Sequence, residues 1–105
     1  MDVQLKRGLL DICVLKALLT EDSYGYKIVK DLSPHMKISE STLYPILKRL
    51  EQSRYLTVYM VEHNGRLRKY YRITGAGKVR IHAFLDEWEE VEAIIGYIKG
   101  GMEHE

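Results

Sequence analysis

The 105-residue sequence contains one cysteine, two prolines and no long apolar run. These shortages argue against a disulfide-linked protein and against a membrane-spanning one. Cys13 alone cannot form an internal disulfide, which agrees with a reducing cytoplasm. No stretch approaches the roughly 18 apolar residues of a membrane span, and the N-terminus lacks the apolar core of a signal peptide. We therefore expect a soluble, cytoplasmic, single-domain globular protein with a modest core.

Residues that could form a catalytic or metal site are also scarce. The histidines are scattered without the spacing of metal ligands, at His35, His63, His82 and His104. Cys13 lies in an apolar stretch that is typical of a small core residue. The sequence therefore predicts no enzyme, no metal site and no cofactor.

The net charge is only +1, but the charges are unevenly distributed. Residues 1–82 carry 15 Lys and Arg against 8 Asp and Glu, whereas residues 83–105 carry 1 against 7. A basic body with an acidic C-terminal section suits a surface that faces phosphates, together with a segment that stays away from them. The alternative is chance clustering plus a solvated acidic helix face, which charge alone leaves open.

In the first half of the chain, the periodicity of the apolar residues predicts two helices. A helix over residues 4–19 is apolar on most of its circumference, so more than one neighbour is expected to bury it. A second helix over residues 24–32 has Asp22 or Ser23 as its N-cap. It ends at Ser33–Pro34, because the residue before a proline avoids the α region.

A third helix follows, with Ser39 as its natural N-cap and Ser41 or Thr42 as competitors. Pro45 lies past the positions where a missing N–H is harmless, which predicts a bend or a later start. The residues expected to point inward are Leu43, Ile46, Leu47 and Leu50. The residues expected on the exposed side are Ser41, Thr42, Tyr44 and Lys48.

Residues 55–62 then alternate with the period of a half-buried strand. Asn64-Gly65 predicts a type I′ turn, which needs positive φ at both central positions. Placing His63 opposite Arg66 pairs Val58 with Tyr71, so that apolar side chains meet across the hairpin. Thr74 can cap a last helix, although Gly75 and Gly77 weaken its first turn.

The last helix, over residues 77–99, has the clearest periodicity in the sequence. It would be about 34 Å long, more than a small domain can cover, so a second copy of the chain is its simplest partner. The alternative is that it folds back on the first helix within one chain. The residues expected at the dimer interface are Ile81, Phe84, Leu85, Trp88, Val91, Ile95 and Ile98.

Together these patterns predict a mainly α protein with a small β-hairpin (α+β). Residues 1–74 would form a winged helix-turn-helix domain with its wing at about 56–74, residues 75–100 a dimerisation helix, and residues 101–105 a tail. Such a domain binds DNA through a helix N-terminus and a basic hairpin. The candidate DNA-binding residues are Ser39, Ser41, Thr42, Tyr44, Lys48, Arg49, Arg66, Arg68 and Lys69. For Lys48 and Arg49 the alternative is a solvated helix face.

Trp88 is the candidate for ligand binding, because an indole in a dimer seam is hard to pack against its symmetry mate. A gap there could accept a planar aromatic compound, flanked by Phe84, Val91 and Ile95. Acidic residues at the rim, such as Glu87 and Glu89, would favour a cationic ligand. The alternative is that Trp88 simply fills the dimer core.

The order of these segments resembles one known family. GLLDICVLKALL, YGYKIVKDL, ISESTLYPILKRLE and NGRLRKYYRITGAGK, followed by a Trp-bearing helix, are similar to the PadR family of bacterial transcriptional regulators over residues 5–99. The single helix after the wing resembles the branch with a short C-terminal region. The resemblance implies a homodimeric winged-helix repressor that is relieved by small molecules, aromatic compounds among them. The two-fold symmetry of such a dimer predicts a pseudo-palindromic operator. The rival reading is a winged-helix module that docks proteins without binding DNA.

Overall fold

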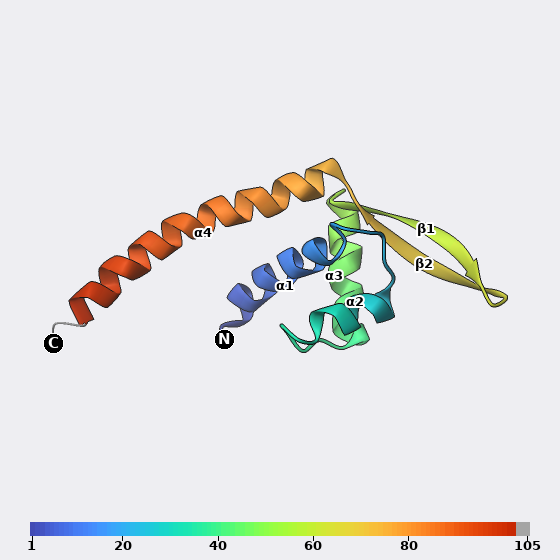
Figure 1. Cartoon of the computed structure of the whole chain (residues 1–105), viewed down its shortest axis with the longest axis horizontal. Coiled ribbons are helices and arrows are strands. Elements are labelled where there is room, and N and C mark those ends of the chain that lie inside the picture. Colours follow the sequence, from blue (N-terminus) through green and yellow to red (C-terminus); the bar gives the residue numbers. More distant parts are fainter. Residues whose placement is uncertain (103–105) are drawn as a thin grey trace.

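The structure, a computed structural model, describes residues 1–102 and contains four helices and one hairpin. The elements are α1 (Val3–Ala17), α2 (Gly25–Leu32), α3 (Glu40–Gln52), β1 (Leu56–His63), β2 (Arg66–Ile73) and α4 (Gly75–Met102). The helices α1, α2 and α3 pack together, whereas the hairpin and α4 extend from them in opposite directions (Figure 1). The molecule is therefore elongated, at 64 × 26 × 21 Å. The predicted mainly α fold with a small hairpin is confirmed.

The core lies between the three packed helices and the base of the hairpin. Val14 and Leu15 of α1 are fully buried, as are Ile28 of α2 and Leu43 and Leu47 of α3. The helix α1 contacts α2, α3 and α4, so the prediction that several neighbours bury it is confirmed. This burial of apolar surface is the main force that fixes α3 in place.

The N-cap predicted for α2 is wrong. Tyr24 is the cap residue, and no side chain there accepts a hydrogen bond from the helix. Ser23 instead pairs through its backbone with Tyr71 of β2, with N–O distances of 3.2 and 2.8 Å. Asp22 also binds the hairpin, so both residues proposed as caps connect the segment between α1 and α2 to the wing.

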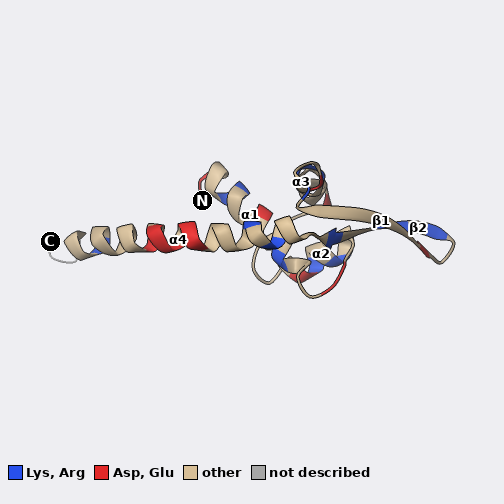
Figure 2. Ribbon diagram, turned by 90° about the horizontal axis from the view of Figure 1, so that it is seen from above, with Lys and Arg blue, Asp and Glu red and all other residues tan. Residues whose placement is uncertain are grey.

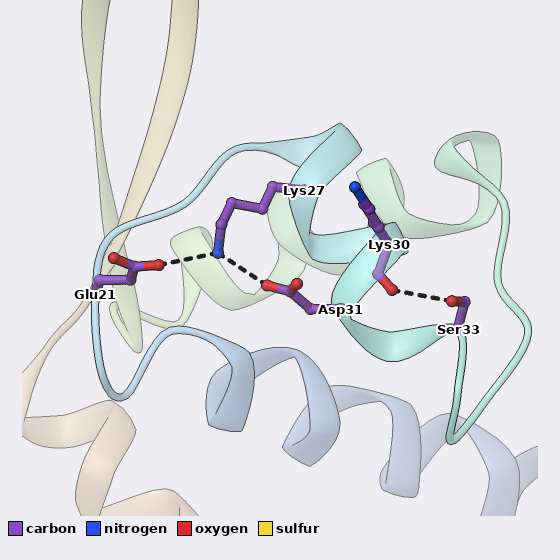
Figure 3. A network of polar contacts seen from close by, with 5 residues as sticks. All are labelled: Glu21, Lys27, Lys30, Asp31 and Ser33. Atoms are coloured by element: carbon purple, nitrogen blue, oxygen red, sulfur yellow. Dashed lines mark hydrogen bonds and ion pairs between the residues drawn. The ribbon is translucent and has the colours of Figure 1, made fainter.

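An ion-pair network fixes the start of α2 to the segment before it. The Lys27 ammonium donates to Glu21 and to Asp31, at 3.0 Å each (Figure 3). The hydrogen bond to Glu21, followed by that to Asp31, raises the pKa of Lys27. Figure 3 also shows that the Lys30 side chain points away from this network, while the Lys30 carbonyl accepts from Ser33. The positive charge of Lys27 is thus balanced by two carboxylates of the same chain.

The helix α3 begins where its strongest cap predicts. Ser39 has extended backbone and its hydroxyl accepts from Thr42 N. The helix runs unbroken from Glu40 through Pro45, so the predicted later start is wrong. Because proline has no N–H, the Ser41 carbonyl lacks its usual donor four residues on. The side chains predicted to point inward from α3 are all buried.

The hairpin follows the predicted register throughout. Val58 pairs with Tyr71 and His63 with Arg66. Asn64 and Gly65 have φ angles of 52° and 78°, as a type I′ turn requires. The turn therefore sets which face of β2 presents each cation.

The helix α4 starts directly after the wing and is longer than predicted. The Thr74 hydroxyl accepts from Gly77 N at 3.1 Å, so the predicted cap is confirmed. The helix continues through Met102, and residues 101 and 102, expected in the tail, are therefore helical. Residues 103–105, the rest of that expected tail, lie outside the described residues. No helix within residues 1–102 is both long and apolar enough to cross a membrane.

Candidate nucleic-acid interface

Three hydroxyl side chains stand at the start of α3. Ser39 Oγ lies 2.9 Å from Ser41 Oγ and 3.1 Å from Thr42 Oγ1, and accepts from Thr42 N at 3.2 Å. Each hydroxyl has one proton and two lone pairs, so this cluster keeps acceptor capacity for a donor from outside. Ser41 and Thr42 are exposed, as predicted, whereas Ser39 is engaged as the cap.

Tyr44, one turn further along α3, lies against the start of α2. A Cβ placed on Gly25 would lie 2.7 Å from Tyr44 Oη, so this approach needs a residue without a side chain. Tyr44 remains 47% exposed, and its neighbour Tyr26 is also exposed. The phenol is thus held from one side and open on the other.

An open groove of about 830 Å³ lies between the first turn of α3, the start of α2 and the tip of the wing. Its lining residues are Tyr24, Gly25, Tyr26, Glu40, Tyr44, His63, Asn64, Arg66, Leu67, Arg68, Lys69 and Tyr71. Four predicted DNA-binding residues meet there: Tyr44, Arg66, Arg68 and Lys69. The other five lie on α3 or at its N-cap and do not line the groove: Ser39, Ser41, Thr42, Lys48 and Arg49.

The wing supplies the positive charge of this groove. Figure 2 shows the basic residues of β2 close to the hairpin tip. Arg66 and Lys69 are exposed, whereas Arg68 is half-buried with its guanidinium carbon 4.1 Å from the centroid of the Tyr24 ring. A cation over an aromatic face is held in orientation without losing its charge. Arg68 is therefore fixed before any ligand arrives.

A cluster of aromatic and charged side chains joins the wing to the segment before α2. The ring of Tyr70 lies 5.3 Å from Tyr24 and 5.7 Å from Tyr59. Tyr59 donates to Asp22 Oδ2 at 2.6 Å, and Arg72 Nε donates to the same oxygen at 3.0 Å. The hydrogen bond from Tyr59, followed by that from Arg72, lowers the pKa of Asp22. The wing is thereby fixed relative to α2.

No local pattern in the sequence pointed to this cluster. Asp22 lies 37 residues before Tyr59 and 50 residues before Arg72, so only the folded chain brings them together. Within the cluster, the ring of Tyr70 stacks on that of Tyr59 across the hairpin.

The two basic residues near the middle of α3 differ in their surroundings. Lys48 is exposed and forms no ion pair within residues 1–102. Arg49 forms an ion pair with Asp11 of α1. Arg49 therefore has a partner inside the protein that sequence reasoning did not anticipate.

The predicted seam of α4 is buried at its start and exposed towards its end. Ile81 is buried, and the rings of Phe84 and Trp88 stack with centroids 6.0 Å apart and planes 16° apart. Further along, Ile95 and Ile98 are 36% and 54% exposed. Leu85, also expected at the interface, is 52% exposed. The first part of the seam thus packs on the chain's own core, whereas the residues further along are not covered by any other part of the described chain.

The Cys13 thiol is held in the protonated form, which is the less reactive one. Burial raises the pKa of the Cys13 thiol, whose sulfur lies 3.6 Å from that of Met36. No three His, Cys, Asp or Glu side chains within residues 1–102 form a group able to hold a metal ion.

A three-helix core, a polar helix start and a basic hairpin beside it define a winged helix-turn-helix protein. The chain belongs to the PadR-like transcriptional regulator family, which matches residues 14–83. It is therefore a transcriptional regulator of that family and not an enzyme.

Several known proteins resemble the chain over most of its length. A transcriptional regulator of Mycobacterium tuberculosis, Rv3488, is 28% identical over 102 residues, covering 96% of this chain and 92% of that protein. The crystal structure of a PadR family regulator from Eggerthella lenta is 34% identical, with a TM-score of 0.82 over 91% of this chain and 86% of the other. Bacillus subtilis PadR, solved in complex with operator DNA, shares the fold at 24% identity, with a TM-score of 0.67 over 73% of this chain and 46% of that one.

Proposed function

We propose that this chain is a homodimeric, sequence-specific DNA-binding repressor of the cytoplasm, relieved by a small planar aromatic compound. The groove between α3 and the wing is the observation that carries the DNA-binding part. It combines the exposed Tyr44 of α3 with cations from β2. The structure of Bacillus subtilis PadR with operator DNA supports this reading.

The first turns of α3 would enter the major groove, which is about 12 Å wide and admits a helix of about 10–12 Å diameter. Ser41, Thr42 and Tyr44 are exposed there and suit base-edge or phosphate contacts. Arg66, Lys69 and Lys48 would contact the DNA backbone, where cations add affinity and little sequence information. Because Arg49 pairs with Asp11, its contribution would be smaller than that of Lys48.

The exposed end of the α4 seam supports a dimer. A second copy would cover Val91, Ile95 and Ile98, which one chain leaves partly exposed. Two-fold symmetry then predicts a pseudo-palindromic operator with half-sites about 34–36 Å apart. The acidic residues at the middle of α4 would lie away from the wing tip (Figure 2).

The stacked pair of Phe84 and Trp88 supports a ligand site between the two copies. A flat aromatic compound could extend that stack. Release of DNA would require the ligand to prefer a spacing of the two subunits that mismatches the operator.

A salt-titrated binding assay on a random-duplex pool, with sequencing of the retained fraction, tests the DNA-binding part. We expect an inverted repeat whose affinity falls steeply with salt, since several phosphates are neutralised per subunit. Arg66→Ala should lower the slope of log affinity against log salt by about one unit. If no duplex is retained even at low salt, the alternative of a protein-docking module would take its place.

A further inference from the structure

Glu40, the first residue of α3, is the one carboxylate among the residues that line the groove. It stands four residues before Tyr44 and hence on the same face of the helix. Its side chain forms no ion pair with any cation of residues 1–102. An unpaired negative charge thus lies on the surface that we propose for DNA.

This position is unfavourable for general binding to DNA. Duplex DNA carries one negative charge per roughly 1.7 Å of its axis, and a carboxylate that approaches it is repelled. Arg66 and Lys69 line the same groove, yet Glu40 is paired with neither of them. Residue 40 would therefore weaken binding to any duplex unless one base compensates for the repulsion.

The chemistry of the major groove indicates which base that is. An ionised carboxylate only accepts hydrogen bonds, so it needs a donor from a base edge. Guanine presents two acceptors there and thymine an acceptor and a methyl group. Adenine offers its amino group beside the N7 acceptor, whereas cytosine offers an amino donor with no acceptor of its own beside it.

We propose that Glu40 reads one cytosine in each half-site of the operator by accepting a hydrogen bond from its N4 amino group. This inference rests on the DNA-binding function proposed above and adds a specificity-determining residue to it. Glu40 rejects guanine and thymine at that position by repulsion between acceptors.

A purely structural role for Glu40 makes a different prediction. A carboxylate in the first turn of a helix interacts favourably with the positive end of the helix dipole. If this were its only role, Glu40→Gln would lower the melting temperature and leave the base preference unchanged. The two roles are separated by measuring both quantities on the same variant.

The test compares the wild-type chain with Glu40→Gln and with Glu62→Gln, all as full-length protein. Glu62 is exposed on β1 and does not line the groove, so its variant removes the same charge from the wing. Each protein is titrated with the selected operator, with duplexes in which each half-site cytosine is replaced in turn, and with an unrelated duplex. Circular dichroism confirms that each variant is folded.

We expect one symmetric cytosine whose replacement weakens wild-type binding at least about fivefold, the usual cost of a mismatch. Glu40→Gln should lose the preference for cytosine and favour adenine at that position, because an amide can accept from N6 and donate to N7 of adenine. It should also bind the unrelated duplex more tightly than the wild type. Glu62→Gln should keep the cytosine preference. Retention of that preference by Glu40→Gln would overturn the inference, whereas a wild type that binds no duplex would overturn the proposed function itself.

Discussion

Two glycines in the first turn of α4 have opposite surroundings, which makes them a matched pair for a test. A Cβ on Gly77 would lie 2.2 Å from the Tyr55 carbonyl oxygen, whereas nothing lies within 4 Å of one on Gly75. Gly77→Ala should therefore cost about 1–3 kcal/mol by overpacking. Gly75→Ala should be neutral or stabilise by up to about 1 kcal/mol, because alanine favours the helix. Urea unfolding of both variants measures the difference, and equal stabilities would contradict the close packing at residue 77.

Residues on α3 and on the wing should differ in what they contribute to binding. Thr42→Ala and Tyr44→Ala should cost more affinity on the preferred operator than on random duplex, because these side chains lie where base edges are expected. Arg68→Ala should weaken binding to all duplexes to a similar degree. Titrations of each variant with both kinds of DNA decide between these outcomes. A uniform loss at all three positions would show that sequence is read elsewhere.

At the scale of elements, Asp22 connects the segment before α2 to both strands of the wing. Its pKa is lowered in the folded chain, so the ionised carboxylate stabilises the fold above the unfolded pKa of about 3.9. This contribution is lost as the pH falls through the lower pKa of the folded state. Asp22→Asn should therefore reduce stability at pH 7 and flatten its decline below about pH 4.

The free energy of unfolding, measured in urea at several values between pH 7 and pH 3, tests this. Tyr59→Phe should show an effect of the same sign, because it removes the largest contribution to the lowered pKa of Asp22. The effect should be smaller than that of Asp22→Asn, because Arg72 still pairs with the carboxylate. An unchanged pH dependence in Asp22→Asn would show that the cluster does not stabilise the wing.

The elements that could be predicted from sequence are those encoded by local signals. The hairpin register follows from the turn at Asn64-Gly65 and from alternation, and the start of α3 follows from the capping hydroxyl of Ser39. The cap of α2 could not be predicted, because Asp22 is bound by side chains that lie far along the chain. The same reason hid the ion pair of Arg49 with Asp11. Interactions between distant segments carry no short-range pattern.

In the candidate interface, too, the residues that a local pattern reveals were predicted, and those that depend on packing were not. The cations of the wing were found because Arg66, Arg68 and Lys69 stand together in residues 63–71, a stretch without Asp or Glu. The contribution of Tyr24 and Gly25 was missed, because it depends on how α2 packs beside α3.

For the whole molecule, Val91 tests the proposed dimer. Val91→Asp places a charge in the middle of the exposed seam and should convert the dimer to a monomer. Ala93→Asp adds the same charge on the opposite face of α4, where residue 93 is exposed, and should leave the dimer intact. Sedimentation equilibrium of both variants gives the masses. An unchanged mass for Val91→Asp would place the interface elsewhere.

The junction between the wing and α4 is a single residue, Thr74, which is hydrogen-bonded to the segment before β1. Its N–H donates to the Tyr55 carbonyl at 3.0 Å, and its hydroxyl donates to the Arg54 carbonyl at 2.8 Å. These two hydrogen bonds connect the start of α4 to the segment before β1. A tilt of about 5° over a helix of about 42 Å moves its far end by about 3.7 Å, close to the rise of one base pair. In a dimer joined through α4, a change of a few degrees in the angle between the two α4 helices would change the distance between the two DNA-binding surfaces. That angle would therefore decide which half-site spacing the dimer can bind.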